Sequence, residues 1–132
     1  MNILYVDDDL EDKEFFLEAV RSIDPTIQCS IASGGREALE GLTGGYILPS
    51  CIFLDINMPL MDGKTCLIEI KKQYALRDIP VIMYSTTSDT NQIKECYRLG
   101  AFDFLIKPNT LKKLSEDLIS ILVQLKREGQ QR

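Results

Sequence analysis

Side chains that could do chemistry stand directly after four short apolar runs of this chain. They are Asp7-Asp8-Asp9, Asp55, Ser85-Thr86-Thr87 and Lys107. Carboxylates gathered at one point repel each other and raise one another's pKa unless a cation lies among them. Mg²⁺ suits such a place, because it takes a few carboxylate or carbonyl oxygens and keeps several waters. A lysine and a hydroxyl beside the cation would suit the oxygens of a phosphoryl group, which a carboxylate can itself accept.

The elements between these residues predict how they would meet. Short apolar runs indicate buried strands at residues 3–6, 27–32, 51–54, 81–84 and 102–106. Amphipathic segments between and after them indicate helices around residues 16–23, 38–42, 67–70, 93–97 and 111–125. Strict alternation of this kind predicts a doubly wound α/β fold, a five-stranded parallel sheet with five helices on its two faces. Ligands bind outside the carboxyl ends of such strands, so the polar groups are expected at one rim.

Helix ends are also predicted from residue types. Asn109 is the expected N-cap of the last helix, because its side-chain oxygen can accept from free amides of the first turn. Gly100 is expected to end the fourth helix in a left-handed conformation. Residues 1–127 are interpreted as one domain and residues 128–132 as a short polar tail.

Composition excludes several classes of function. A net charge of −5 argues against direct binding of nucleic acid, which needs an excess of clustered lysine and arginine. The absence of histidine removes histidine-dependent triads and the common zinc sites. The four cysteines form no C-x-x-C pair and are interpreted as small apolar residues in a reducing compartment. Neither an export leader nor an apolar run of roughly 20 residues is visible, so no membrane contact and a cytoplasmic location are expected.

Four motifs occur together in one order and at one spacing. They are Tyr5-Val6-Asp7-Asp8, Leu54-Asp55-Ile56-Asn57-Met58-Pro59 with Gly63 after it, Val81-Ile82-Met83-Tyr84-Ser85, and Phe104-Leu105-Ile106-Lys107-Pro108. Over residues 3 to 125 the chain therefore resembles the receiver domain of two-component response regulators, of the stand-alone type. The resemblance implies a flavodoxin-like strand order of 2-1-3-4-5.

The resemblance also implies roles for the site residues. Asp55 would be the phosphoacceptor, taking a phosphoryl group from a phosphohistidine of a sensor histidine kinase or a histidine phosphotransfer protein. Asp8 and Asp55 would bind Mg²⁺ directly with the backbone carbonyl of Asn57, and Asp7 would act mostly through a metal-bound water. Lys107 would pair with the phosphoryl oxygens. The chain would be a signalling domain that catalyses only its own phosphorylation and dephosphorylation.

Two further residues would form the switch that the resemblance implies. Ser85 would move toward the phosphoryl group, and Phe104 would turn inward into the space that this movement vacates. The surface of the fourth helix, fifth strand and fifth helix would then change shape and engage a downstream protein or a second copy of the chain. Phe104 stands where many relatives carry tyrosine and Ser85 where many carry threonine, so ring burial alone would report the switch, while the hydroxyl donor is kept.

Other interpretations of the same residues remain open. Asp8 or Asp9 could simply cap the first helix, and Ser88 the fourth. A phosphohydrolase of the haloacid-dehalogenase type also uses Asp, Ser or Thr, Lys and Mg²⁺, but it expects a D-x-D nucleophile on the first strand and a cap over the substrate. An adaptor that keeps the receiver shape without being phosphorylated is a further alternative.

Overall fold

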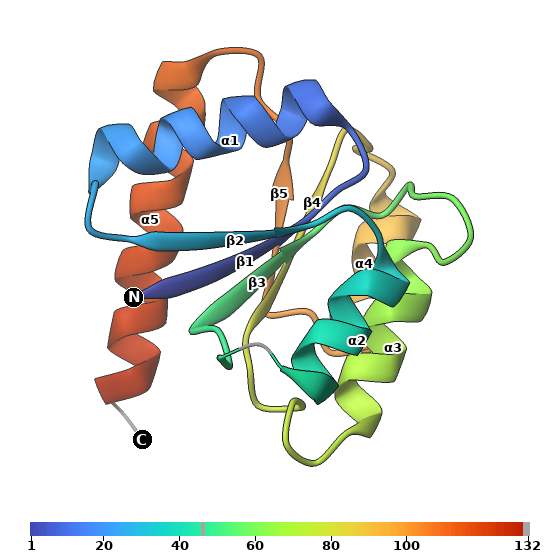
Figure 1. Ribbon diagram of the computed structural model, residues 1–132. Coiled ribbons are helices and arrows are strands. Elements are labelled where there is room, and N and C mark those ends of the chain that lie inside the picture. The colour runs from blue at the N-terminus through green and yellow to red at the C-terminus, as the bar shows by residue number, and fades with distance from the viewer. Residues whose placement is uncertain (46, 131–132) are drawn as a thin grey trace.

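Strands and helices alternate along the whole described chain (Figure 1). The structure is a computed structural model that describes residues 1–45 and 47–130. The strands are β1 (Asn2–Val6), β2 (Gln28–Ala32), β3 (Cys51–Leu54), β4 (Val81–Ser85) and β5 (Asp103–Ile106). The helices are α1 (Leu10–Ile23), α2 (Gly35–Gly44), α3 (Gly63–Lys72), α4 (Thr90–Arg98) and α5 (Leu111–Gln130). Each predicted strand and helix is therefore present.

All strands of the sheet run parallel in the order β2-β1-β3-β4-β5. This confirms the doubly wound α/β fold and the flavodoxin-like strand order. The chain order reverses beside β1, which pairs with β2 on one side and with β3 on the other. Because Val6 pairs with Leu54, the residues that follow them, Asp7 and Asp55, leave the sheet side by side. The fold thus creates a rim at the place where such sheets bind ligands.

Two apolar layers hold the sheet between the helices. Figure 1 shows α1 and α5 on one face of the sheet and α2, α3 and α4 on the other. Successive side chains of a strand point to opposite faces, so Ile3 and Tyr5 of β1 enter the first layer, while Leu4 and Val6 enter the second. Both faces of β3 and β4 are buried, which explains why these strands are continuous apolar runs in the sequence.

The predicted helix ends are partly correct. Gly100 follows α4 with φ of 109°, the left-handed conformation that the sequence indicated. The cap of α5 was predicted one residue too early: the helix begins at Leu111, and the amide of Lys113 donates to Thr110 Oγ1 at 3.2 Å rather than to Asn109. The cap of α4 is Asp89 instead of Ser88, because the Asp89 side chain accepts from the amide of Asn91.

The C-terminal helix is longer than expected. α5 continues to Gln130, three residues into the segment interpreted as a polar tail, and residues 131 and 132 lie outside the described part. The last helix has the predicted buried face, with Leu114, Leu118 and Ile121 in the core. None of the described helices is long and apolar enough to cross a membrane.

Candidate functional site

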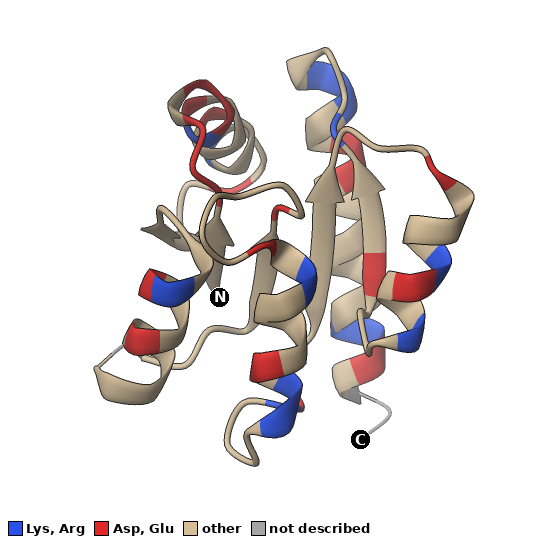
Figure 2. Ribbon diagram, turned by 90° about the vertical axis from the view of Figure 1, so that its right-hand side faces the viewer, with Lys and Arg blue, Asp and Glu red and all other residues tan. Residues whose placement is uncertain are grey.

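Three carboxylates meet at the carboxyl ends of β1 and β3. Each of Asp7, Asp8 and Asp55 offers an oxygen that lies within 4.8 Å of the others. Asp7 is 0% exposed and Asp55 5% exposed, whereas Asp8 faces solvent. Figure 2 shows acidic residues in the loop that leads from β1 into α1, at this end of the sheet. The prediction that the strand ends deliver these acids to one rim is correct.

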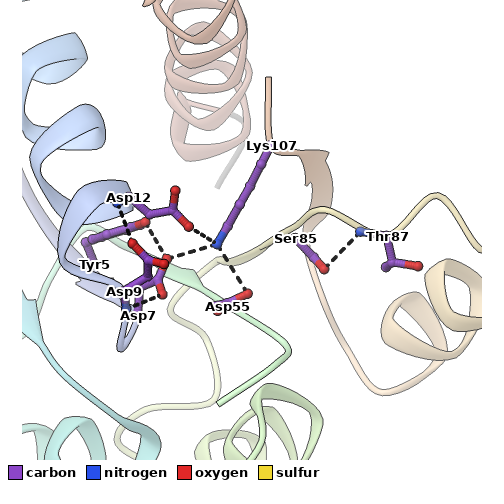
Figure 3. Close-up of polar contacts among 8 residues, drawn as sticks. All are labelled: Tyr5, Asp7, Asp9, Asp12, Asp55, Ser85, Thr87 and Lys107. Carbon is purple, nitrogen blue, oxygen red and sulfur yellow. Dashed lines mark hydrogen bonds and ion pairs between the residues drawn. The ribbon is translucent and has the colours of Figure 1, made fainter. Parts of the chain in front are cut away.

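Lys107 brings a positive charge from the end of β5 into the same rim (Figure 3). Its ammonium lies 3.0 Å from Asp7 Oδ2, 2.8 Å from Asp12 Oδ2 and 3.5 Å from Asp55 Oδ1. It also lies 5.2 Å from the centre of the Tyr84 ring. Burial alone would lower the pKa of the Lys107 ammonium, but the surrounding carboxylates of Asp12, Asp55 and Asp7 raise it. The side chain is therefore a fixed cation at the centre of the acids.

Asp7 accepts hydrogen bonds on both of its carboxylate oxygens. The Tyr5 hydroxyl donates to its Oδ2 at 2.7 Å, and the backbone amide of Asp9 donates to its Oδ1 at 3.0 Å. Burial on its own would raise the pKa of Asp7, but these donors together with Lys107 hold it below its usual value. Both Asp7 oxygens thus accept hydrogen bonds, while the residue also belongs to the acidic group with Asp8 and Asp55.

Asp55 has the opposite electrostatic character. Burial and the neighbouring Asp7 together raise the pKa of its carboxyl to about 7, although the Lys107 ammonium acts in the opposite direction. A divalent cation among the acids would favour the ionised form of Asp55. The donor set fits such a cation, since hard ions of the Mg²⁺ type prefer carboxylate and carbonyl oxygens. Asp8 and Asp55 would supply carboxylate oxygens, and Asn57 follows two residues later in the loop between β3 and α3.

Ser85 and Phe104 lie near the rim without taking part in the acidic cluster. Ser85 ends β4 and is completely buried, and its hydroxyl oxygen accepts the amide of Thr87 at 3.2 Å. Phe104 pairs with Met83 across β4 and β5 and is half-buried against the layer under α2, α3 and α4. The structure thus places the Ser85 hydroxyl at the strand end and Phe104 on the neighbouring strand, as the sequence indicated.

Two members of the cluster were missed by the sequence analysis. Tyr5 lies in β1, and Asp7 follows the end of this strand two residues later. The two-residue period of extended chain places both on the same face, so this spacing could have found Tyr5. Asp12 lies in the first turn of α1, three residues after the cap Asp9. Its contact with Lys107 depends on how α1 is rotated over the rim, and no sequence pattern sets that rotation.

The capping alternative for the first acids holds for one of them. Asp9 is the N-cap of α1, because its Oδ1 accepts the amide of Asp12 at 3.0 Å. Asp8 instead contributes its carboxylate to the group with Asp7 and Asp55. The adjacent acids therefore have separate roles, one structural and one at the rim.

The fold and the rim define a doubly wound α/β domain with an acidic, metal-compatible site and a lysine at its strand ends. The family model described as response regulator receiver domain matches residues 3–119 of this chain. The chain therefore belongs to the response regulator receiver family and is a receiver domain of two-component signalling. This membership speaks against the phosphohydrolase alternative.

Similar proteins differ in how much of their length this chain covers. The chain is 34% identical over 115 residues to a protein-glutamate methylesterase/protein-glutamine glutaminase of Methanococcoides burtonii, a match that covers 86% of this chain and 31% of that protein. It is also 34% identical over 107 residues to the two-component response regulator ORR5 of Oryza sativa subsp. japonica, covering 81% of this chain and 78% of that protein. The chain thus spans about a third of the methylesterase relatives and most of the rice regulator.

Solved structures agree with the fold and come from the same family. The Mn²⁺-bound form of response regulator Rcp1 is 30% identical, with a TM-score of 0.80 over 91% of this chain and 90% of that chain. The phosphorylated cyanobacterial phytochrome response regulator RcpA is 28% identical, with a TM-score of 0.83 over 91% of this chain and 89% of that chain.

Proposed function

We propose that this chain is a phosphoacceptor switch in which Asp55 accepts a phosphoryl group in a Mg²⁺-dependent reaction. The observation that carries the proposal is the position of the Lys107 ammonium, between the buried carboxylates of Asp7 and Asp55 at one strand rim. A plain surface lysine would not lie 10% exposed among three acids. The Mn²⁺-bound form of Rcp1 and the phosphorylated form of RcpA support the same chemistry.

Different residues of this chain would hold the metal ion, accept the phosphoryl group and pair with its oxygens. Asp8, Asp55 and the Asn57 carbonyl would hold Mg²⁺, with Asp7 acting through a bound water. A bound Mg²⁺ would neutralise charge on the carboxylates and on the phosphoryl oxygens. An oxygen of Asp55 would attack the phosphorus, forming the O–P bond while the P–N bond of the phosphohistidine breaks and its electron pair returns to the imidazole. Lys107 would then pair with the transferred phosphoryl group.

The phosphohistidine comes from a partner under this proposal. The chain contains no histidine, so a sensor histidine kinase or a histidine phosphotransfer protein would have to supply it. The net charge of −5 gives no support to a direct nucleic-acid partner.

The phosphoryl group would shift the domain from one packing to another through Ser85 and Phe104. The Ser85 hydroxyl uses an oxygen lone pair on the Thr87 amide, so its proton is available to a phosphoryl oxygen. Movement of this strand end would open space for the half-buried Phe104, and the surface of α4, β5 and α5 would change shape. Such a switch is a shift in population between two packings, which a downstream protein or a second copy of the chain would read.

Intact mass spectrometry tests the proposal directly. The wild type is incubated with Mg²⁺ and acetyl phosphate, beside Asp55→Asn and a sample with excess chelator. We expect the mass of one phosphoryl group on the wild type and on neither of the others. Asp62→Asn is a matched control, because Asp62 caps α3 through its contact with the Thr65 amide and asparagine caps as well as aspartate.

Each other result has a definite meaning. A gain of mass that persists in Asp55→Asn would show that another residue is the acceptor. No gain with any phosphodonor would favour the adaptor that is never phosphorylated.

A further inference from the structure

The shortest ion pair of Lys107 is made with Asp12, at 2.8 Å, and not with Asp55, at 3.5 Å. We propose that Asp12 is a positioning residue that holds the Lys107 ammonium on the α1 side of the rim and competes with the phosphoryl group for it. The inference rests on the proposed function and deepens it, because it names a residue that sets how strongly the site retains a phosphoryl group.

The Lys107 ammonium donates hydrogen bonds to Asp7 Oδ2 at 3.0 Å and to Asp12 Oδ2 at 2.8 Å, whereas Asp55 Oδ1, at 3.5 Å, is an ion-pair neighbour only. An ammonium donates at most three hydrogen bonds, and Asp7, Asp12 and Asp55 are the acids within ion-pair distance of it. Figure 3 shows the lysine side chain extending between Asp12 on one side and Asp55 on the other. Any N–H that remains on Asp12 is one that a phosphoryl oxygen on Asp55 does not receive.

Asp7 and Asp12 differ in how firmly they are held. Asp7 is completely buried and is fixed by the Tyr5 hydroxyl and the Asp9 amide, so it stays with Lys107 in either state. The side chain of Asp12 is 39% exposed and can exchange Lys107 for water at low cost. Asp7 is therefore the permanent anchor of the lysine, and Asp12 is the partner that the lysine can leave.

The burial of Lys107 makes this competition matter. Its side chain is only 10% exposed, and one side of the ammonium faces the Tyr84 ring at 5.2 Å. Without Asp12 the ammonium would turn more fully toward Asp7 and Asp55. It would then oppose a cation in the metal-binding position, because both carry positive charge, and it would favour a phosphoryl group.

Opposite effects on two ligands distinguish this role from simple damage to the site. In Asp12→Asn we expect beryllofluoride, a phosphoryl analogue, to bind about two- to fivefold more tightly at saturating Mg²⁺, the range of a half-exposed ion pair. We expect Mg²⁺ alone to bind more weakly than in the wild type. A distorted or partly unfolded site would weaken both ligands.

A neighbouring charge provides the matched control. Glu11 is exposed on the same turn of α1, so Glu11→Gln removes one negative charge beside Asp12 without touching Lys107. Its two affinities should stay close to those of the wild type.

The experiment measures beryllofluoride binding by ¹⁹F NMR and Mg²⁺ binding by calorimetry on the full chain. Tighter beryllofluoride with weaker Mg²⁺ in Asp12→Asn alone would support the proposal. Equal or weaker beryllofluoride binding in Asp12→Asn, or the same change in Glu11→Gln, would overturn it while leaving the proposed function intact. A wild type that binds no beryllofluoride and accepts no phosphoryl group would instead contradict the proposed function itself.

Discussion

At the scale of single residues, adjacent aspartates at the end of β1 have different tasks. Asp7 is buried and surrounded by donors, whereas Asp8 is exposed and brings an oxygen toward Asp55. We therefore expect Asp8→Ala to weaken Mg²⁺ binding by about tenfold or more. Losing a direct metal ligand should cost at least as much affinity as losing a residue that only hydrogen-bonds a ligand. Calorimetric titration with Mg²⁺ measures the affinity, and a thermal melt by circular dichroism checks that the fold is retained.

Asp9→Asn is the control for that experiment. The Asp9 side chain caps α1, and asparagine is an equally good cap, so this variant should keep both its fold and its Mg²⁺ affinity. Unchanged affinity in Asp8→Ala would remove Asp8 from the proposed metal ligands.

The residues that sequence reasoning found and missed at this site differ in a physical way. Asp7, Asp55, Ser85 and Lys107 directly follow or end strands, and parallel strands deliver their ends to one rim. Asp12 lies on a helix, and its contact with Lys107 is made across 95 residues of sequence. Such a contact depends on packing between α1 and the sheet, which the local pattern does not contain.

At the scale of elements, the approach of α3 to the end of β3 sets the position of Asp55. The amide of Gly63 donates to the carbonyl of Ile56 at 2.8 Å. A Cβ atom at Gly63 would overlap the backbone carbonyl of Asp55 and lie 2.8 Å from Ile56 Cα. Glycine is therefore required here for close approach of two backbone segments, one of which carries the acceptor residue.

Gly63→Ala should destabilise the domain and disturb the site together. We expect a loss of about 1–3 kcal/mol in the free energy of unfolding, as for overpacking of a tight contact, and slower phosphorylation by acetyl phosphate. Gly44→Ala is the comparison, because a Cβ atom at this position in α2 meets nothing within 4 Å. That variant should be as stable as the wild type or slightly more stable. Urea unfolding and intact mass after timed incubation measure the two effects, and a fully stable Gly63→Ala would contradict this account of the loop.

Element existence was easier to predict than element ends. Periodic apolar residues indicated every strand and helix, but the caps of α4 and α5 were each placed one residue too early. Both caps lie in runs of consecutive capping residues, Ser88-Asp89-Thr90 and Asn109-Thr110. Any of these side chains can accept an amide, so backbone conformation decides among them, and composition does not.

For the molecule as a whole, the free energy of unfolding should depend on pH through the acids of the site. Folding buries Asp55 beside Asp7 and raises the pKa of its carboxyl from 3.8 to about 7. A raised carboxyl pKa contributes stability below the unfolded value, and this contribution is lost as the pH rises through the folded value. Asp7, whose pKa is lowered from 3.8, has the opposite dependence, and it matters only in more acidic solution. Between pH 5 and pH 8, as an approximate window, the Asp55 effect should dominate.

The metal-free protein should therefore become less stable as the pH rises across this window, by on the order of 2–4 kcal/mol. Saturating Mg²⁺ should remove the loss, because the cation binds the ionised carboxylates that the fold otherwise disfavours. Urea unfolding followed by circular dichroism measures this, since the chain has no tryptophan. Asp55→Asn has no carboxyl to titrate, so its stability should stay nearly level from pH 5 to pH 8. If the same decline persisted in Asp55→Asn, a group other than Asp55 would cause the loss of stability at higher pH. The stabilisation by Mg²⁺ could then not be attributed to Asp55.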